Sequence, residues 1–382
     1  MFSVALIPGF TASDLAIIAT GQRIWFDQRI AALTGLGAMR LAPNGIDPGQ
    51  PDGAAMGHSA DPQFPWETIK DNLTQQLDPK KWKVGIGTWD WRLDINTAAN
   101  TLAADIKANV SFEEPITLVA HSAGGLLAVL CYAKLMTTND QMKVRRIVTI
   151  GTPFLGSYGP IQWLTGISDT VQQLLAVSQA FGQVTGFHPA LWTLQFLNGI
   201  ACTWPAFYEL FPALVTEEER FDPFRTFLYE SQLYPHYADP SQSWLDFART
   251  SWQPQITALG NSPPSWVLTC VAGVGLTTPN RLLTGELPLA LRDLGTTQEG
   301  DGVVTYLSAA KLPSLIVRVP GEHASLPLGI TISGLLAELI VDPRGPGSPT
   351  PTPEFNKLLI SMNVTAPPES EPFSGLVCIG GG

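Results

Sequence analysis

Charged side chains are scarce in this sequence of 382 residues: Asp, Glu, Lys and Arg make up 14% of it, against about 25% in typical soluble domains. Basic residues are the scarcer sign, and the formal net charge is −11 at pH 7. Nucleic-acid binding needs basic patches that neutralise phosphates, and electrostatic binding to anionic membranes needs clusters of Lys and Arg. We therefore predict no nucleic-acid partner, and any contact with lipid must be made by apolar side chains.

Cysteines and long apolar runs are also few. The four cysteines lie far apart without a CxxC motif, so their spacing indicates neither a disulfide framework nor a zinc site, and we predict no metal and no cofactor. The first residues lack the basic and apolar regions of a secretory signal. The apolar segment 326–341 is shorter than the roughly 18 residues of a membrane span and contains Glu338, so a buried core helix is expected there. These features predict a cytoplasmic protein or one bound peripherally to a membrane.

Apolar residues nevertheless make up 45% of the chain, and many fall in short runs that alternate with helix-like segments. Several runs are almost continuously hydrophobic, as in strands that helices cover on both faces. The segment 124–138 fits a helix between two such runs. This alternation predicts an α/β fold with a mostly parallel sheet flanked by helices. The predicted strands are 4–8, 83–88, 116–120, 146–151, 266–273 and 315–320.

The alternation breaks between about residues 155 and 262, a region rich in aromatic residues and proline. We expect a largely helical insertion there that caps the sheet as part of one domain, residues 1–343. Its aromatic residues either contact a lipid surface or build the insertion's own core. Residues 344–355 are rich in Pro and Gly and predict a linker. Residues 356–382 form a short tail for which the sequence indicates no role.

The motif that carries chemistry is Ala120-His121-Ser122-Ala123-Gly124. A serine between small residues, on a sharp turn from a strand to a helix, is typical of a nucleophile elbow, and the predicted strand 116–120 and the helix after it supply that setting. A plain turn is the alternative. A serine hydroxyl also needs a base that takes its proton and a carboxylate that orients the base.

Three histidines follow the serine in the chain: His188, His236 and His323. His323 comes directly after the predicted strand 315–320 and is the favoured base, whereas His188 and His236 fall within the aromatic insertion. His121 is expected to pack or hydrogen-bond locally and is a candidate substrate contact. His58 is expected in a loop, without a core strand to aim it.

Asp301 is the favoured carboxylate because glycines flank it and a predicted strand lies upstream. Asp293 and Glu299 compete with it, and an ordinary Asp-Gly turn is the simpler interpretation. An oxyanion needs two backbone N–H donors. Ala123, directly after the nucleophile, is expected to supply one, and Phe10, after the first strand, is expected to supply the other.

Eight segments follow one another along the chain: IPGFTASDL (7–15), IWF (24–26), WDWRL (89–93), AHSAGG (120–125), IGTPFLGS (150–157), WPAFYELFPAL (204–214), GDGVVTYLS (300–308) and EHASL (322–326). In this order they resemble the lecithin:cholesterol acyltransferase family of α/β-hydrolases. Ala12 and Trp89 depart from the family pattern, which usually has glycine and tyrosine at these positions. Arg92 could bind a substrate phosphate, but a structural tie between the sheet and a neighbouring loop is favoured.

The resemblance implies an α/β-hydrolase fold and a triad of Ser122, Asp301 and His323. It also implies a lipid acyl ester as substrate and a lid formed by the insertion, through which peripheral membrane contact is expected. Thr11 and Trp163 are further candidate substrate contacts. The resemblance leaves open whether water or an alcohol accepts the acyl group. A small-substrate esterase, amidase or peptidase remains an alternative, as does an inactive binding module. The oligomeric state is not indicated.

Overall fold

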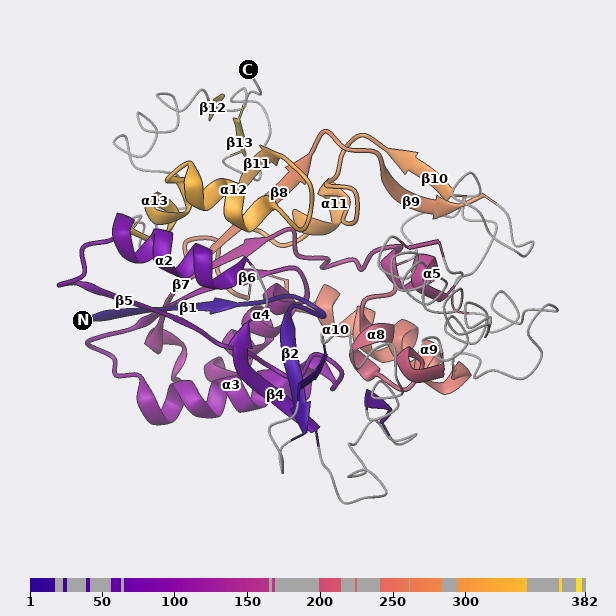
Figure 1. Ribbon diagram of the computed structural model, residues 1–382, viewed down its shortest axis with the longest axis horizontal. Helices are drawn as coiled ribbons and strands as arrows, with labels where there is room; N and C mark the ends of the chain where they lie inside the picture. The colour runs from indigo at the N-terminus through magenta and orange to yellow at the C-terminus, as the bar shows by residue number, and fades with distance from the viewer. Residues whose placement is uncertain are drawn as a thin grey trace, which may run out of the picture.

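The computed structural model describes residues 1–17, 23–25, 39–41, 56–62, 65–164, 167–168, 199–213, 224, 241–260, 262–283, 294–341, 364–365 and 376–379. An eight-stranded sheet lies at its centre, in the order β12-β13-β11-β8-β7-β6-β1-β5 (Figure 1). The six predicted strands are confirmed, with ends shifted by a few residues, and all six are parallel. They are β1 (Phe2–Ile7), β5 (Trp82–Ile86), β6 (Ile116–His121), β7 (Val144–Ile150), β8 (Leu268–Val274) and β11 (Leu315–Pro320).

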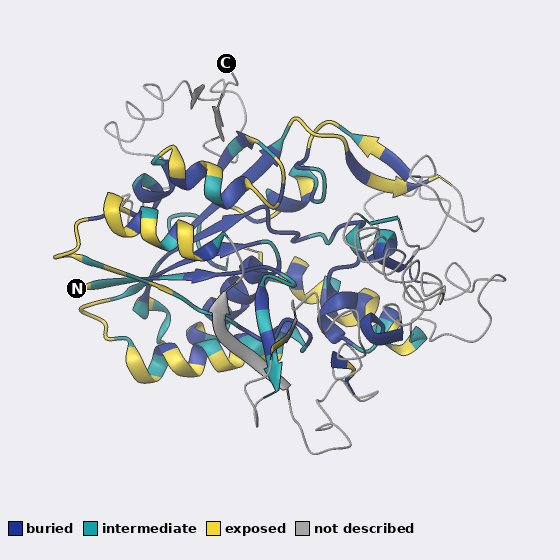
Figure 2. Ribbon diagram, in the orientation of Figure 1, coloured by how far each residue is buried: buried dark blue, intermediate teal, exposed yellow. Residues whose placement is uncertain are grey.

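Helices cover both faces of this sheet, which explains the hydrophobic strands. In β6, Leu118 and Ala120 join one hydrophobic cluster while Val119, between them, joins the other. Buried strands run between helices whose outer sides are exposed (Figure 2). One face is covered by α3 (Ile95–Asn109) and α4 (Ala123–Met136), and the other by α2 (Trp66–Gln76), α12 (Leu326–Ile332) and α13 (Leu335–Val341).

The apolar segment 326–341 forms two helices, α12 and α13, where the sequence predicted one. The chain turns between them at Gly334, whose φ of 79° suits a residue without a side chain. Both helices pack against the sheet, so the prediction of a buried core segment is confirmed and the prediction of a single helix is wrong. Within the part of the chain that the structure describes, no helix is both long and apolar enough to span a bilayer.

The predicted tail contributes two strands to the edge of the central sheet. β13 (Leu376–Ile379) pairs in parallel with β11, and β12 (Val364–Thr365) pairs antiparallel with β13. Two smaller antiparallel sheets were also not predicted. They contain β2 (Ser13–Ile17), β3 (Arg23–Trp25) and β4 (Met56–Pro62) in one case, and β9 (Thr278–Leu282) and β10 (Leu294–Thr297) in the other.

The described part of the expected insertion is helical and lies beyond the carboxyl ends of the sheet strands (Figure 1). Most of its described aromatic side chains are buried, and they belong to the same hydrophobic core as helices α3 and α4 and the sheet face that these helices cover. Phe10, three residues after the end of β1, packs against this core, with ring centroids 6.1 Å from Trp204 and 6.4 Å from Phe207. The helices are α5 (Gly159–Leu164), α8 (Pro205–Glu209), α9 (Gln242–Phe247), a π-helical turn (Ala248–Trp252) and α10 (Gln253–Ala258). The buried aromatics among the described residues of the insertion are Tyr158, Trp163, Trp204, Phe207, Tyr208, Phe211, Phe224 and Trp252.

Candidate active site

Ser122 occupies the turn between β6 and α4 in a backbone conformation that side chains rarely adopt. Its φ is 53° and its ψ is −130°, a region that costs a non-glycine residue about 1–3 kcal/mol. Neighbouring strands hold the turn, since the Ser122 N–H donates to the carbonyl of Ile150 at 2.9 Å. This is the geometry of a nucleophile elbow, which projects the hydroxyl from the edge of the sheet.

The glycines around Ser122 are required by close backbone contacts. A Cβ atom on Gly124 would lie 2.5 Å from the carbonyl oxygen of Pro8 and 2.7 Å from that of Ile7. A Cβ atom on Gly9 would lie 2.8 Å from the Cβ atom of Ser122. The small residues of the motif therefore allow the elbow to pack directly against the loop after β1.

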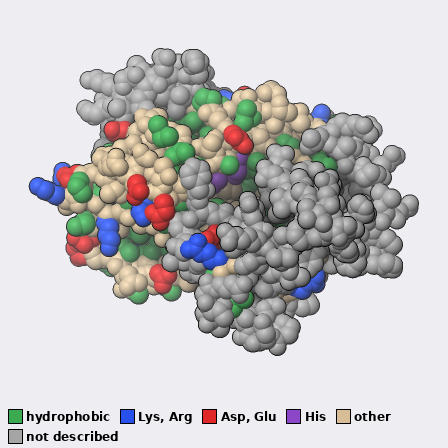
Figure 3. Space-filling view, viewed as in Figure 1, with side chains coloured by type: hydrophobic (Ala, Val, Ile, Leu, Met, Phe, Trp, Pro, Cys, Tyr) green, Lys and Arg blue, Asp and Glu red, His purple; other side chains and the backbone are tan. Residues whose placement is uncertain are grey.

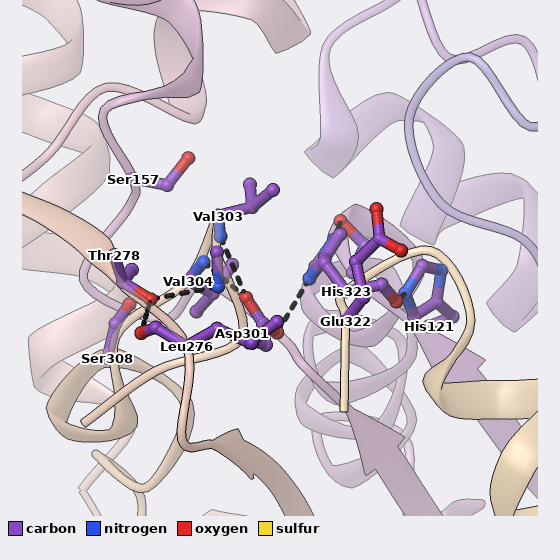
Figure 4. A network of polar contacts seen from close by, with 12 residues as sticks. His121, Ser157, Leu276, Thr278, Asp301, Val303, Val304, Ser308, Glu322 and His323 are labelled. Atoms are coloured by element: carbon purple, nitrogen blue, oxygen red, sulfur yellow. Dashed lines mark hydrogen bonds and ion pairs between the residues drawn. The ribbon is translucent and has the colours of Figure 1, made fainter. Parts of the chain in front are cut away.

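His323 lies between Ser122 and Asp301, in the order that proton transfer from the serine requires, and Figure 4 shows its contact with Asp301. Its Nε2 atom is 3.0 Å from Oγ of Ser122, and its Nδ1 atom is 2.8 Å from Oδ2 of Asp301. Histidine atoms reach the surface on the face shown in Figure 3, and His323 is 9% exposed. The structure thus brings together the three residues that the sequence predicted.

Asp301 is fully buried and is fixed by its own turn. Its Oδ1 atom accepts hydrogen bonds from the N–H groups of Val303 and Val304 at 3.0 and 2.7 Å (Figure 4). Burial acts to raise the pKa of this carboxyl group, but the charge and hydrogen bond of His323, together with the two amides, outweigh it and lower the pKa. Asp301 is therefore a carboxylate, ready to orient His323 and to stabilise its charged form.

The competing residues lie elsewhere. Glu299 forms an ion pair with Arg318 and is largely exposed. His58 lies in β4, where its backbone is opposite Leu15, so the expectation of a loop is wrong. Three further candidates, Asp293, His188 and His236, lie outside the described residues.

The two predicted oxyanion donors flank the serine. Ala123 begins α4, and Phe10 follows the Gly9 that packs against Ser122. Neither backbone N–H has a hydrogen-bond partner among the described residues. A backbone donor of this kind leaves no signature in the side-chain sequence, so the assignment of Phe10 and Ala123 stays a prediction.

The remaining predicted contacts differ in their surroundings. Thr11 follows Phe10 and has a φ of 63°. Trp163 is buried with other aromatic side chains of the insertion, and its indole N–H has no hydrogen-bond partner among the described residues. Arg92 is fully buried and pairs with Asp90 through two bonds, Nε to Oδ1 at 2.9 Å and Nη2 to Oδ2 at 2.7 Å. These contacts favour the structural interpretation of Arg92.

His121 makes a contact that the sequence did not predict. Its Nε2 atom is 3.0 Å from the backbone carbonyl oxygen of His323, 202 residues further along the chain. We expected His121 to pack or hydrogen-bond locally. A carbonyl acceptor on a distant loop leaves no signature in the sequence. A group of three or more His, Cys, Asp or Glu residues that could bind a metal does not occur within the described ranges.

With this geometry, the fold and the site define an α/β-hydrolase, and comparisons agree. The lecithin:cholesterol acyltransferase family matches residues 62–189, which confirms the resemblance that the motifs predicted. No curated protein sequence matches the chain significantly. The Tle4–Tli4 complex contains a chain with a TM-score of 0.53 at 10% identity, over 90% of this chain and 99% of that one. At this identity, the similarity shows the fold alone.

Two further structures are similar to the chain over most of its length. The lipase BlEst2 of Bacillus licheniformis in its propeptide form has a TM-score of 0.41 at 14% identity, over 91% of this chain and 52% of that one. The phospholipase PlaB of Legionella pneumophila has a TM-score of 0.42 at 9% identity, over 95% of this chain and 63% of that one. Together with the family match, the fold supports an acyl ester hydrolase or acyltransferase.

Proposed function

We propose that this protein is a serine hydrolase or acyltransferase that acts on lipid acyl esters, with Ser122, His323 and Asp301 as its catalytic triad. The observation that carries the proposal is the continuous chain of contacts from Oγ of Ser122 through both ring nitrogens of His323 to Asp301, at 3.0 and 2.8 Å. This chain of contacts begins at a nucleophile elbow, where the backbone conformation of the serine costs about 1–3 kcal/mol. An ordinary turn without a catalytic role would not require this strain.

The first half of the reaction forms an acyl-enzyme. Nε2 of His323 takes the proton from Ser122 as Oγ attacks the ester carbonyl carbon, and the N–H groups of Phe10 and Ala123 stabilise the oxyanion. The bond from the carbonyl carbon to the leaving alcohol then breaks, and His323 gives its proton to that alcohol. Asp301 stabilises the imidazolium while it exists.

The second half releases the acyl group. His323 takes a proton from water or from an acceptor alcohol, whose oxygen attacks the acyl-enzyme. The ester bond to Ser122 breaks, and Oγ recovers the proton from His323. Hydrolysis and acyl transfer differ only in which hydroxyl enters, so the same residues serve both.

A lipid substrate is supported by the surroundings of the serine. The carboxyl edge of the sheet faces an insertion whose described side chains are largely aromatic and apolar, and apolar walls suit acyl chains. The family that matches residues 62–189 is named for acyl transfer from a phospholipid. Peripheral membrane contact through outward residues of the insertion remains part of the proposal.

Replacing the nucleophile tests the proposal. We expect Ser122→Ala to lower ester turnover by orders of magnitude and to abolish covalent labelling by a fluorophosphonate, which reacts with an activated serine Oγ. Ser333→Ala is the matched control, because Ser333 is exposed in the turn between α12 and α13 and its hydroxyl donates to the nearby backbone carbonyl of Ile330. Ester turnover that persists in Ser122→Ala would reject the proposed chemistry.

A substrate panel tests the proposed specificity. Phospholipids, short soluble esters and amides are incubated with the protein, with and without an added alcohol, and the products are identified by mass spectrometry. We expect fatty acid from the lipids, and new esters if the alcohol is an acceptor. Turnover of short esters or amides alone would retain the triad and reject the lipid substrate.

A further inference from the structure

His121 connects the nucleophile turn to the loop that carries His323. It immediately precedes Ser122, and its Nε2 atom lies 3.0 Å from the carbonyl oxygen of His323. The two imidazole rings are 4.7 Å apart between centroids (Figure 4). On other sides, His121 contacts the ring of Trp66, 6.1 Å away, and its Nδ1 atom lies 3.3 Å from where a Cβ atom on Gly9 would be. One side chain thus contacts three separate segments of the site.

The hydrogen bond determines the chemical form of His121. A carbonyl oxygen can only accept, so Nε2 must carry the proton and donate it. Burial, followed by the charge of His323, lowers the pKa of His121 to about 3, although the hydrogen bond to His323 and the charge of Asp301 act in the opposite direction. His121 is therefore a neutral donor at the pH at which esterases work, and it adds no charge to repel the imidazolium of His323.

The main chain of His323 is consequently held on both sides. Its N–H donates to the carbonyl of Asp301 at 2.9 Å, and its carbonyl oxygen accepts from His121 at 3.0 Å. Gly321, two residues earlier, has a φ of 157°, a backbone conformation that residues with a side chain rarely adopt. The distance from Nε2 of His323 to Oγ of Ser122 then depends on these two backbone bonds as well as on the rings.

We propose that His121 is a positioning residue, which acts through His323 by fixing the backbone carbonyl of that residue with its Nε2–H. This role rests on the proposed function of the triad, and it differs from the substrate contact that the sequence suggested. His121 is 7% exposed and its donor is already used. The consequence concerns reaction geometry, since misplacement by about 1 Å can cost 10²-fold in rate.

Three substitutions separate positioning from packing. Gln carries its amide N–H at about the distance of Nε2 along the side chain, Asn carries it one carbon too close to the backbone, and Leu has similar volume without a donor. We expect His121→Leu and His121→Asn to lower kcat by about 10–100-fold with little change in KM. We expect His121→Gln to restore most of kcat. Fluorophosphonate labelling rates should follow kcat, because both need His323 to activate Ser122.

The comparison is made on folded protein, with thermal unfolding measured for each variant. A role limited to packing would make kcat follow stability, so that Gln, Asn and Leu would fall in the order of their melting temperatures. Equal kcat values in Gln and Leu variants of equal stability would overturn the positioning role. Recovery by Gln alone supports it.

The unaltered protein offers an independent measurement if the variants do not fold. Nitrogen-15 NMR of the imidazole side chains distinguishes the two neutral tautomers and the charged form. We expect His121 to remain the neutral Nε2–H tautomer from pH 8 down to pH 4. An ordinary histidine, with a pKa of about 6.5, is charged at pH 4. An Nδ1–H tautomer, or titration near pH 6.5, would overturn the proposal. The NMR measurement does not depend on turnover. A failure of the positioning role is therefore distinguished from a failure of the proposed function, which Ser122→Ala tests.

Discussion

Asp301 holds His323 at two points. The carboxylate Oδ2 is 2.8 Å from Nδ1 of the ring, and the backbone carbonyl of Asp301 accepts the N–H of His323 at 2.9 Å. The first contact sets the tautomer of the ring and the second sets the position of its backbone. A substitution of the side chain can remove one and leave the other.

Asp301→Asn is predicted to damage catalysis while the fold persists. The amide keeps the size of the side chain and the backbone bond, but it cannot both accept from Nδ1–H and supply the negative charge that stabilises the imidazolium. We expect kcat to fall by up to about 10⁴-fold, as measured with a soluble ester. Far-ultraviolet circular dichroism should remain that of the parent.

Glu299→Gln is the matched control for this change. Glu299 is close in sequence, carries the same charge and pairs with Arg318 at the surface. We expect its kcat to match that of the parent. If Glu299→Gln lowered kcat as much as Asp301→Asn does, Asp301 would not be distinguished as the carboxylate of the triad, and the assignment would be contradicted.

Gly124→Ala is predicted to lower both stability and turnover. The new methyl group would approach the carbonyl oxygens of Pro8 and Ile7 to 2.5 and 2.7 Å, and backbone atoms cannot rotate away. We expect about 1–3 kcal/mol of destabilisation, measured by urea unfolding, and a reduced kcat because the displaced loop carries the predicted donor Phe10.

Gly329→Ala is the control for the added methyl group. Gly329 is an exposed residue of α12, and a Cβ atom there would meet nothing within 4 Å. Alanine is favoured over glycine in a helix by about 0.5–1 kcal/mol. We expect equal or slightly greater stability and unchanged turnover. Equal losses in both variants would mean that the contacts of Gly124 are not the cause.

The convergence of Ser122 and His323 could be predicted because each directly follows a parallel strand of the central sheet. Ser122 follows β6, and His323 follows β11. Asp301 lies beyond β8 and the β9–β10 hairpin. Carboxyl ends of parallel strands share one edge of the sheet, so the hydrophobic pattern was sufficient for Ser122 and His323, whereas Asp301 was favoured for its flanking glycines and the strand upstream.

The contacts that the sequence did not predict depend on backbone atoms or on weak local patterns. The carbonyl of His323 has no side-chain signature, so the donor from His121 could not be anticipated. The strands β2 and β9 are short. In β2, half-buried residues alternate with buried ones, so the strand has no continuous apolar run that would have predicted it. The turn at Gly334 splits an apolar segment whose hydrophobicity alone predicts a single helix.

Arg92→Met is predicted to destabilise the protein without altering substrate preference. The change leaves the carboxylate of Asp90, which is 8% exposed, without its two hydrogen bonds from the guanidinium. Breaking a buried pair on one side costs about 3–5 kcal/mol, which urea unfolding would measure. The double change Asp90→Asn with Arg92→Met should recover part of the loss, because no charge is then stranded.

The same variant tests the alternative role of Arg92. A guanidinium that binds a substrate phosphate would favour phospholipids over neutral esters. We expect the ratio of kcat/KM for the two substrate classes to be unchanged in folded Arg92→Met. A selective loss for the phospholipid would establish the binding role and contradict the structural one.

Glu209 is predicted to make the stability of the protein fall as the pH rises. This fully buried carboxyl group of α8 accepts the N–H of Ile95 at 2.9 Å, at the start of α3. Burial, and then the negative charge of Asp94, raise the pKa of Glu209 well above its ordinary value of 4.5. The folded state therefore holds a proton that the unfolded state releases above that value. The contribution of Glu209 to the free energy of unfolding is fully present below pH 4.5. It is lost as the pH rises toward the pKa of the folded state, by up to about 1.4 kcal/mol per pH unit.

Glu209→Gln should remove this dependence. The amide is neutral at every pH, retains an oxygen that can accept from Ile95 and has N–H groups that can donate to Asp94. We expect the variant to gain stability relative to the parent between pH 5 and pH 9, as measured by urea unfolding at several pH values in one buffer series. Glu113→Gln, at an exposed position, is the control and should follow the parent. A difference between Glu209→Gln and the parent that stays constant over this range would show that Glu209 does not take up a proton on folding.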